Sequence, residues 1–222
     1  MTITSMSAPR RVAIRLLAVA ALSATLGACA PLVVGGAAVG TALVAVDRRS
    51  SGAQLDDQAI ELRASNRVRE QLGERANVYV TSYNRQVLLT GEAASEAVKT
   101  QVQTIVAGVD NVRTIVNELG VINSPGLSQR STDTLLTGRV KAAFVDARNL
   151  DPTAVKVVTT RNVVYLLGRV TQREADRATE VTRNISGVQR VVRVFEIITE
   201  EELARLLAPR DRQQTAPPAP AN

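Results

Sequence analysis

The chain has 222 residues, of which 27 are basic and 21 acidic, and it contains no histidine and one cysteine. These counts exclude a histidine-based catalytic site, an internal disulfide and a cysteine zinc site. The net charge is +6, of which three arginines lie before Cys29, so the segment from Cys29 onward carries +6 − 3 = +3 and favours anionic surfaces only weakly. Aromatic residues make up only 2% of the chain, so its cores must be filled by Val, Leu, Ile and Ala.

The N-terminal segment has the organisation of an exported lipoprotein. Three arginines lie at or before residue 15, around the start of an apolar run, residues 12–26, as in a signal peptide. The sequence L-G-A-C at residues 26–29 resembles the lipobox of bacterial lipoproteins, the alternative being an apolar helix with a buried cysteine. The resemblance implies that residues 1–28 are removed and that Cys29 is acylated. Because Ala30 follows in place of aspartate, it also implies sorting to the outer membrane.

Residues 29–56 are expected to form a lipidated tether. Within it, Pro31 to Val46 is a second apolar run, rich in glycine and shorter than the roughly 20 residues of a transmembrane helix. We interpret this run as a membrane-proximal tether, with a short helix lying at the bilayer surface as the alternative. A polar break at residues 47–52 follows, after which Asp57 is predicted to cap a helix.

Residues 57–122 are predicted to form a domain with the element order α-β-β-α-β. Ile60, Ala64, Val68 and Leu72 recur every fourth residue and indicate the first helix. Strands at residues 77–82 and 86–90 flank a turn, a second helix spans residues 95–107, and a third strand spans residues 112–119. A right-handed crossover would place the third strand in the same sheet, with both helices on one face.

The same order returns in residues 131–199, after a linker at residues 123–130 that contains Asn-Ser-Pro-Gly. Asp133 is predicted to cap the first helix, and the remaining elements are expected at residues 155–160, 163–167, 173–185 and 191–198. The second crossover helix is predicted to be two residues longer than the first. An internal repeat of this size indicates one structural unit per copy.

Four glycines mark corresponding points of the two copies and are expected to be structural. They are Gly91 and Gly168, after the second strands, and Gly108 and Gly187, after the crossover helices. We expect Gly108 and Gly187 to occupy left-handed or tightly packed positions, because glycine commonly ends helices in that way.

The C-terminal segment, residues 200–222, is expected to form a short helix followed by a disordered tail. Thr199 and Glu202 have the spacing of a capping box, which predicts a helix to Leu207 whose leucines cover a neighbouring surface. From Pro209 onward the chain is rich in Gln, Ala and Pro and has little apolar surface to bury.

The repeated unit resembles the BON (bacterial OsmY and nodulation) domain. The resemblance is carried by the glycine after the second strand and by the Gly-Val pairs 108–109 and 187–188, and it spans residues 57–198. Together with the lipobox and the D-R-R-S-S-G break, it extends to the family of dual-BON outer-membrane lipoproteins, the division- and outer-membrane-stress-associated lipid-binding proteins. This resemblance implies an α+β fold of two tandem α-β-β-α-β domains, each a three-stranded mixed sheet with two helices on one face.

The family resemblance also implies where the protein acts and on what. It implies a lipid-anchored protein on the periplasmic face of the outer membrane that binds anionic phospholipid and supports envelope integrity. It implies no enzymatic activity, cofactor, metal, nucleic acid or small-molecule substrate. Outer-membrane assembly machinery is expected as a further partner. The alternative function is a protein-interaction adaptor of assembly or division machinery, without direct lipid selectivity.

The first helix of the second copy is the candidate lipid-binding element. Leu136, Val140 and Phe144 share one helical face, which is expected to face the core. The opposite strip is expected to contact lipid: Leu135, Gly138, Arg139, Lys141, Ala142 and Val145. The alternative is a helix that is apolar on two faces because it is wedged between two domains. The corresponding helix of the first copy is expected to be unsuited to an anionic surface, since Glu61, Ser65 and Glu70 are expected to face outward.

No arrangement of residues predicts catalysis. The hydroxyl groups of Tyr79, Tyr83 and Tyr165 are candidates by residue type, but tyrosine within a strand more often packs with its hydroxyl solvated. No pair of carboxylates stands out by its spacing, and the isolated glycines form no phosphate-binding loop. We therefore predict no catalytic residues.

Overall fold

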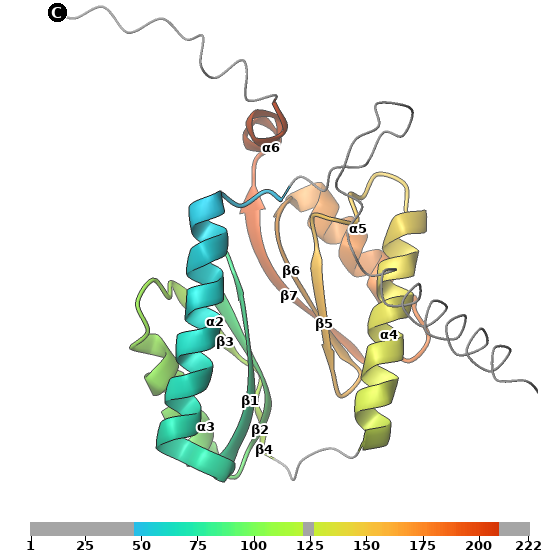
Figure 1. The fold of residues 1–222 in the computed structure, drawn as a ribbon. Coiled ribbons are helices and arrows are strands. Elements are labelled where there is room, and N and C mark those ends of the chain that lie inside the picture. Colours follow the sequence, from blue (N-terminus) through green and yellow to red (C-terminus); the bar gives the residue numbers. More distant parts are fainter. Residues whose placement is uncertain (1–46, 122–126, 209–222) are drawn as a thin grey trace, which may run out of the picture. The chain divides into compact units, whose positions relative to one another are not determined.

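The computed structural model describes residues 47–121 and 127–208, which belong to one compact unit. The predicted signal peptide, Cys29, the apolar run before residue 47 and the tail after residue 208 lie outside the described residues. The ribbon in Figure 1 follows the chain from α2 to α6.

Domain 1, residues 51–121, has the predicted order of elements with one short addition. Its elements are α2 (Ser51–Leu72), a 3-10 turn η2 (Gly73–Arg75), β1 (Ala76–Tyr83), β2 (Gln86–Ala93), α3 (Glu96–Ala107), β3 (Thr114–Asn117) and β4 (Gly120–Val121). β1 and β2 form an antiparallel hairpin, and β3 pairs with β2 in parallel. The predicted third strand is thus interrupted, and its second piece, β4, also pairs in parallel with β2.

Domain 2, residues 127–198, repeats this arrangement. Its elements are α4 (Leu127–Asp146), β5 (Lys156–Thr160), β6 (Val163–Thr171), α5 (Gln172–Arg183) and β7 (Arg190–Ile198). The sheet order is β5-β6-β7, with an antiparallel hairpin and a parallel crossover. The α+β fold with two mixed sheets is therefore confirmed.

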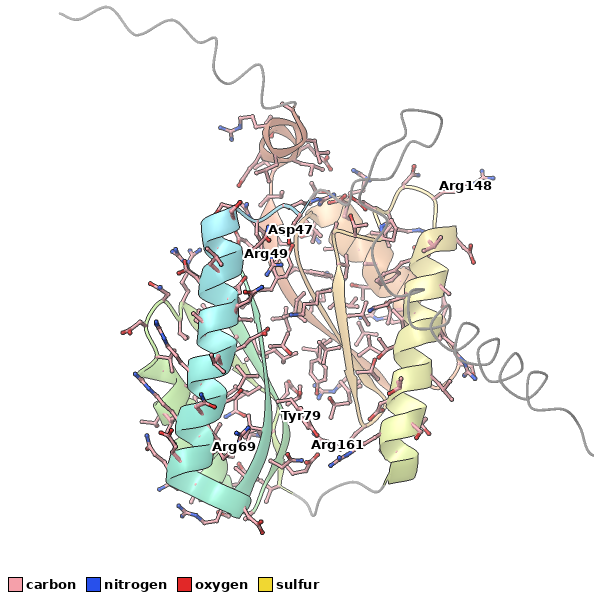
Figure 2. The ribbon with its side chains drawn as sticks, viewed as in Figure 1. Asp47, Arg49, Arg69, Tyr79, Arg148 and Arg161 are labelled. Atoms are coloured by element: carbon pink, nitrogen blue, oxygen red, sulfur yellow. The ribbon has the colours of Figure 1, made fainter. Side chains whose placement is uncertain are left out.

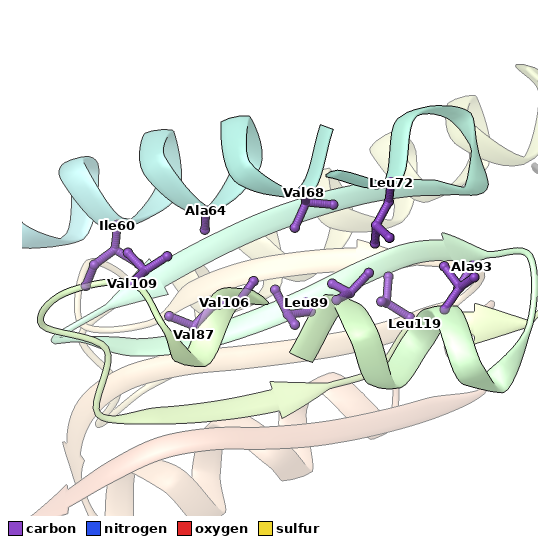
Figure 3. Packing of buried hydrophobic residues seen from close by; sticks show 12 residues of the cluster. Ile60, Ala64, Val68, Leu72, Val87, Leu89, Ala93, Val106, Val109 and Leu119 are labelled. Carbon is purple, nitrogen blue, oxygen red and sulfur yellow. The ribbon is translucent and has the colours of Figure 1, made fainter. Parts of the chain in front are cut away.

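In each domain both helices cover the same face of the sheet. In domain 1, Ile60, Ala64 and Val68 of α2 meet Val87 and Leu89 of β2, with the valines of α3 completing the cluster (Figure 3). Domain 2 has an equivalent core, in which Val140 and Phe144 of α4 are buried. Fully burying one such side chain contributes about 1.5–3 kcal/mol, so several aliphatic residues replace the missing aromatics.

The opposite faces of the two sheets meet each other. Tyr83 and Leu88 of domain 1 form a third buried cluster with Tyr165, Leu167 and Val194 of domain 2. Because strand side chains alternate between faces, Leu88 points into this interface while Val87 and Leu89 point into the core. The interface explains why β2 and β6 are buried almost throughout.

Asp57 and Asp133 are not helix caps, so that prediction was wrong. α2 begins earlier, at Ser51, with the hydroxyl of Ser50 accepting from the amide of Ala53, and α4 begins at Leu127. Asp57 instead accepts from the amides of Asn84 and Arg85, both at 2.7 Å. Asp133 accepts from the two corresponding turn amides of domain 2, both at 2.9 Å. Each aspartate therefore holds the hairpin turn of its own domain.

The hairpin turns themselves follow the prediction. Asn84, Arg85, Arg161 and Asn162 all have positive φ, as a two-residue type I′ turn requires. Asparagine tolerates this geometry better than most residues, but arginine does not. The buried aspartates supply the hydrogen bonds that hold the arginines in it.

Two predictions about the crossover helices were wrong. α3 and α5 have 12 residues each, so neither is longer, and Gly108 has an ordinary φ of −82°. The amide of Val112 bonds to the carbonyl of Val109, as that of Val188 bonds to Ile185. Val112 therefore corresponds to Val188, and the residue that matches Gly187 is Asn111, with a φ of 69°.

The other three marked glycines have distinct environments. Gly187 has a φ of +99°, in the region where side chains are strained. At Gly91 an added Cβ would overlap the carbonyl oxygen of Asn77, and at Gly168 it would overlap that of Ala154. Gly91 therefore lets strand β1 approach closely, and Gly168 does the same for the loop before β5.

The short C-terminal helix is present as α6 (Glu200–Leu207). The hydroxyl of Thr199 accepts from the amide of Glu202 at 3.1 Å and caps it. Leu203 is buried, whereas Leu207 remains about half exposed. Arg169 of β6 fixes the helix by donating to Glu202 at 2.6 Å.

Candidate membrane-contact site

The candidate site is the outer surface of α4. Leu136, Val140 and Phe144 are each at most 3% exposed and anchor the helix in the core of domain 2. The aspartate at position 133 anchors it a second time, through the turn between β5 and β6. The rotation of α4 about its axis is therefore fixed.

All six residues of the predicted lipid-contact strip lie on the exposed side of α4. Leu135 is 66% exposed and Val145 70%. Gly138, Arg139, Lys141 and Ala142, which lie between them, are also exposed. The strip thus combines an apolar surface with two cations.

The cations of this strip are not neutralised by neighbouring side chains. Within residues 47–121 and 127–208, neither Arg139 nor Lys141 takes part in an ion pair, whereas on α5 Arg173 pairs with Glu200 and Arg177 with Glu180. One opposing charge, Asp146, is exposed at the last residue of α4. Arg148, in the loop that follows, adds another exposed cation (Figure 2).

The structure does not support the wedge interpretation of α4. The two domains meet through the faces of their sheets that lie opposite the helices, and no described part of the chain covers the outer side of α4. The apolar strip on α4 therefore has no packing role among the described residues.

The first helix of domain 1 differs in part from the prediction, since Glu70 is exposed as expected but Glu61 and Ser65 are not. Glu61 is half buried, accepting from the amide of Ser82 at 2.8 Å and from Lys156 at 3.3 Å, and Ser65 is also half buried. Two apolar residues of this helix that were not predicted to be exposed, Leu55 and Leu62, are 67% and 65% exposed. They are seven residues apart and share a helical face, a spacing that could have revealed them.

The tyrosines serve packing rather than chemistry. Tyr83 and Tyr165 are buried in the interface between the sheets, and Tyr79 is half exposed. Burial, together with the nearby carboxylate of Glu118, raises the pKa of Tyr165 to about 12, and burial raises the pKa of Tyr83 as well. Both phenols stay protonated at neutral pH, so neither serves as a general base.

Among the described residues, no group of three His, Cys, Asp or Glu side chains is placed to hold a metal ion. In the same part of the chain, no helix is both long and apolar enough to cross a bilayer.

Comparison with known proteins identifies the family. The BON domain model matches residues 56–123 and 132–199. The outer membrane lipoprotein DolP of Haemophilus influenzae is 39% identical over 173 residues, which cover 77% of this chain and 89% of that protein. A 21 kDa hemolysin of Actinobacillus pleuropneumoniae is 34% identical over 69% of this chain and 80% of its own.

Among solved structures, CdsD, a structural protein of the type III secretion system of Chlamydia trachomatis, matches 72% of this chain and 98% of its own. The TM-score is 0.27 and the identity 13%, too low to inform function. The family match and the two relatives give a consistent assignment: this chain belongs to the BON-domain family, among the outer-membrane lipoproteins that carry two BON domains.

Proposed function

We propose that this lipoprotein binds anionic phospholipid through α4 of domain 2 and thereby supports the integrity of the envelope. The observation that carries the proposal is the exposure of an apolar strip with two unpaired cations on a helix whose inner face is fully packed. An amphipathic helix of this kind gains free energy by placing its apolar face at the headgroup boundary.

The expected binding is weak and sensitive to salt. Arg139 and Lys141 would each contribute about 1 kcal/mol at an anionic surface, and Leu135 and Val145 add a small apolar area. Weak binding is sufficient if Cys29 is acylated, because the anchor then holds the helix at a high effective concentration near the bilayer. In this scheme the anchor determines location and the helix selects among lipids.

The proposal is tested with a fragment that begins at Asp47 and so lacks the anchor. In a flotation assay at low salt, the fragment should bind vesicles that contain phosphatidylglycerol and ignore vesicles of phosphatidylcholine alone. The double variant Arg139→Glu, Lys141→Glu should lose binding while its circular dichroism stays unchanged. Equal binding to both kinds of vesicle would instead favour an adaptor without lipid selectivity.

The anchor has a separate test. In cells fed radiolabelled palmitate, the intact protein should incorporate label and Cys29→Ala should not. Label retained by Cys29→Ala would show that the acyl group is attached elsewhere or that the residue is not the anchor.

A further inference from the structure

The outer edge of β1 carries main-chain groups that have no hydrogen-bond partner within residues 47–121 and 127–208. β1 lies at the end of its sheet, and its two-residue turn makes Tyr83 and Gln86 a hydrogen-bonded pair. Hydrogen-bonded pairs alternate along an antiparallel ladder, so the main chains of Thr81 and Tyr79 also bond to β2. The amides and carbonyls of Val78, Val80 and Ser82 therefore point away from the sheet.

One of these outward groups is satisfied and the others are not. The outward amide of Ser82 donates a hydrogen bond to Glu61 of α2 at 2.8 Å. This bond agrees with the assignment of Ser82 as a residue whose main chain points away from β2. Elsewhere along the edge, the outward groups of Val78 and Val80 make no hydrogen bond with any described residue. Glu61 therefore closes the edge at one end and leaves it open toward Ala76.

Two cavities of different chemistry lie on the two sides of this edge and share Tyr79 and Thr81. The cavity between α2 and β1 has a volume of about 820 Å³ and includes Ser65, Val68 and Arg69; Figure 2 labels Arg69 and Tyr79. The cavity on the side of domain 2 has a volume of about 380 Å³. Threonines contribute most of its lining, namely Thr81, Thr90, Thr134, Thr137, Thr159 and Thr160, and the charged residues Glu92, Arg130 and Asp133 also line it.

The corresponding edge of domain 2 is protected. β5 has five residues against eight in β1, and it carries a charged residue, Lys156. The hydroxyl of Thr137 on α4 bonds to that of Thr159 on β5 at 2.8 Å, linking helix and strand. Lysine and short length are common means of preventing unwanted pairing at an edge strand. β1, with the sequence ANVYVTSY, has neither lysine nor proline.

We propose that domain 1 binds an extended segment of a partner protein, which adds as a strand to the edge of β1. The partner main chain would complete the ladder at Val78 and Val80, as in other cases of strand addition. Its side chains would alternate between the two cavities. Because Val68, Val78 and Val80 line the α2 side and threonines line the other, the segment alternates apolar and small polar residues.

The test uses the full chain in detergent micelles and a fluorescent peptide. The peptide has eight residues of alternating valine and threonine, with a lysine at each end for solubility. Its fluorescence anisotropy should rise on titration with protein. A peptide of the same sequence, N-methylated at alternate residues, cannot form the ladder and should not bind. In hydrogen exchange, the bound peptide should slow exchange in residues 76–83.

Two variants and a matched control locate the site. Val80→Pro removes an outward amide, which an edge strand tolerates, and should weaken binding at least about tenfold through a lost hydrogen bond and a blocked approach. Val157→Pro makes the same change on the edge of β5 and should leave binding unchanged. If Val80→Pro fails to fold, Ser65→Trp, which fills the cavity beside α2, replaces it.

Binding that is unchanged in Val80→Pro or Ser65→Trp, or no binding up to 1 mM peptide, would overturn the proposal. So would equal binding of the N-methylated peptide. The lipid proposal is independent of these results, because these substitutions lie outside α4 and should not alter flotation with anionic vesicles.

Discussion

The guanidinium of Arg48 and the carboxylate of Glu174 are joined by two hydrogen bonds, of 2.7 and 2.8 Å. Arg48 directly precedes domain 1, whereas Glu174 lies in the first turn of α5 in domain 2. Arg48 also donates to the carbonyl of Arg169, and Arg169 donates back to the carbonyl of Arg48. The start of domain 1, where the tether is expected to end, is thus fixed to domain 2.

This pair is buried, and its removal should be costly. Glu174→Ala would leave Arg48, a residue only 3% exposed, without its main partner, and we expect a loss of about 3 kcal/mol in the free energy of unfolding by urea. Replacing both residues with Met should recover part of the loss. The matched control is Arg173→Ala, also on α5, which breaks an exposed pair and should change stability little. Similar losses in the two single variants would mean that the buried pair has no special role.

The same pair predicts a dependence on pH. Burial by itself raises the pKa of Glu174, but the hydrogen bonds from Arg48 and the Thr171 amide outweigh it, so the pKa lies below its ordinary value of 4.5. A depressed folded pKa gives stability that is complete above pH 4.5 and is lost as pH falls through the folded value. The melting temperature of the wild type should therefore fall below pH 4.5 more steeply than that of Glu174→Gln. Parallel curves would contradict this assignment.

The buried carboxylate of Asp57 should stabilise the hairpin turn of domain 1. Asp57 accepts from two turn amides and also from Ser82 and Arg49. Asp57→Ala leaves the two turn amides and the Ser82 hydroxyl without this acceptor and should cost about 2–4 kcal/mol, with faster hydrogen exchange at Asn84 and Arg85. Asp110→Asn, at an exposed pair of the same domain, is the control. Slow exchange at the turn in Asp57→Ala would show that the turn is held by other contacts.

The two glycines after the crossover helices should respond in opposite ways. Gly187→Val places a β-branched side chain at a φ of +99° and should destabilise the protein by more than about 1 kcal/mol. Gly108→Ala, at a φ of −82° with ordinary contacts for a Cβ, should be neutral or slightly stabilising. Equal melting temperatures for wild type and Gly187→Val would contradict the backbone assignment.

Much of this fold follows from local patterns in the sequence. The four-residue spacing from Ile60 to Leu72 predicts the inner face of α2, and the turn residues Asn84 and Asn162 predict both hairpins. The exposed strip on α4 was also predictable, because Leu136, Val140 and Phe144 fix which side is buried. These features depend on residues close together in the chain.

Features that depend on distant residues were not predictable. An aspartate near the start of a helical pattern suggests a cap, and only the fold shows that Asp57 lies beside a turn 27 residues later. Gly108 and Gly187 match by residue type and by the valine that follows each, but the left-handed backbone that matches Gly187 belongs to Asn111. The pairing of Arg48 with Glu174 spans 126 residues and has no local signal.

The most direct test of the lipid proposal compares two leucines of nearly equal exposure on the first helices of the two domains. Leu135 on α4 is 66% exposed and Leu62 on α2 is 65% exposed, so substitution by glutamate should affect folding similarly. With the fragment from Asp47 onward and vesicles containing phosphatidylglycerol at low salt, Leu135→Glu should abolish flotation and Leu62→Glu should leave it at the wild-type level. Flotation of Leu135→Glu at the wild-type level, or equal losses in both variants, would contradict the assignment of α4 as the membrane contact.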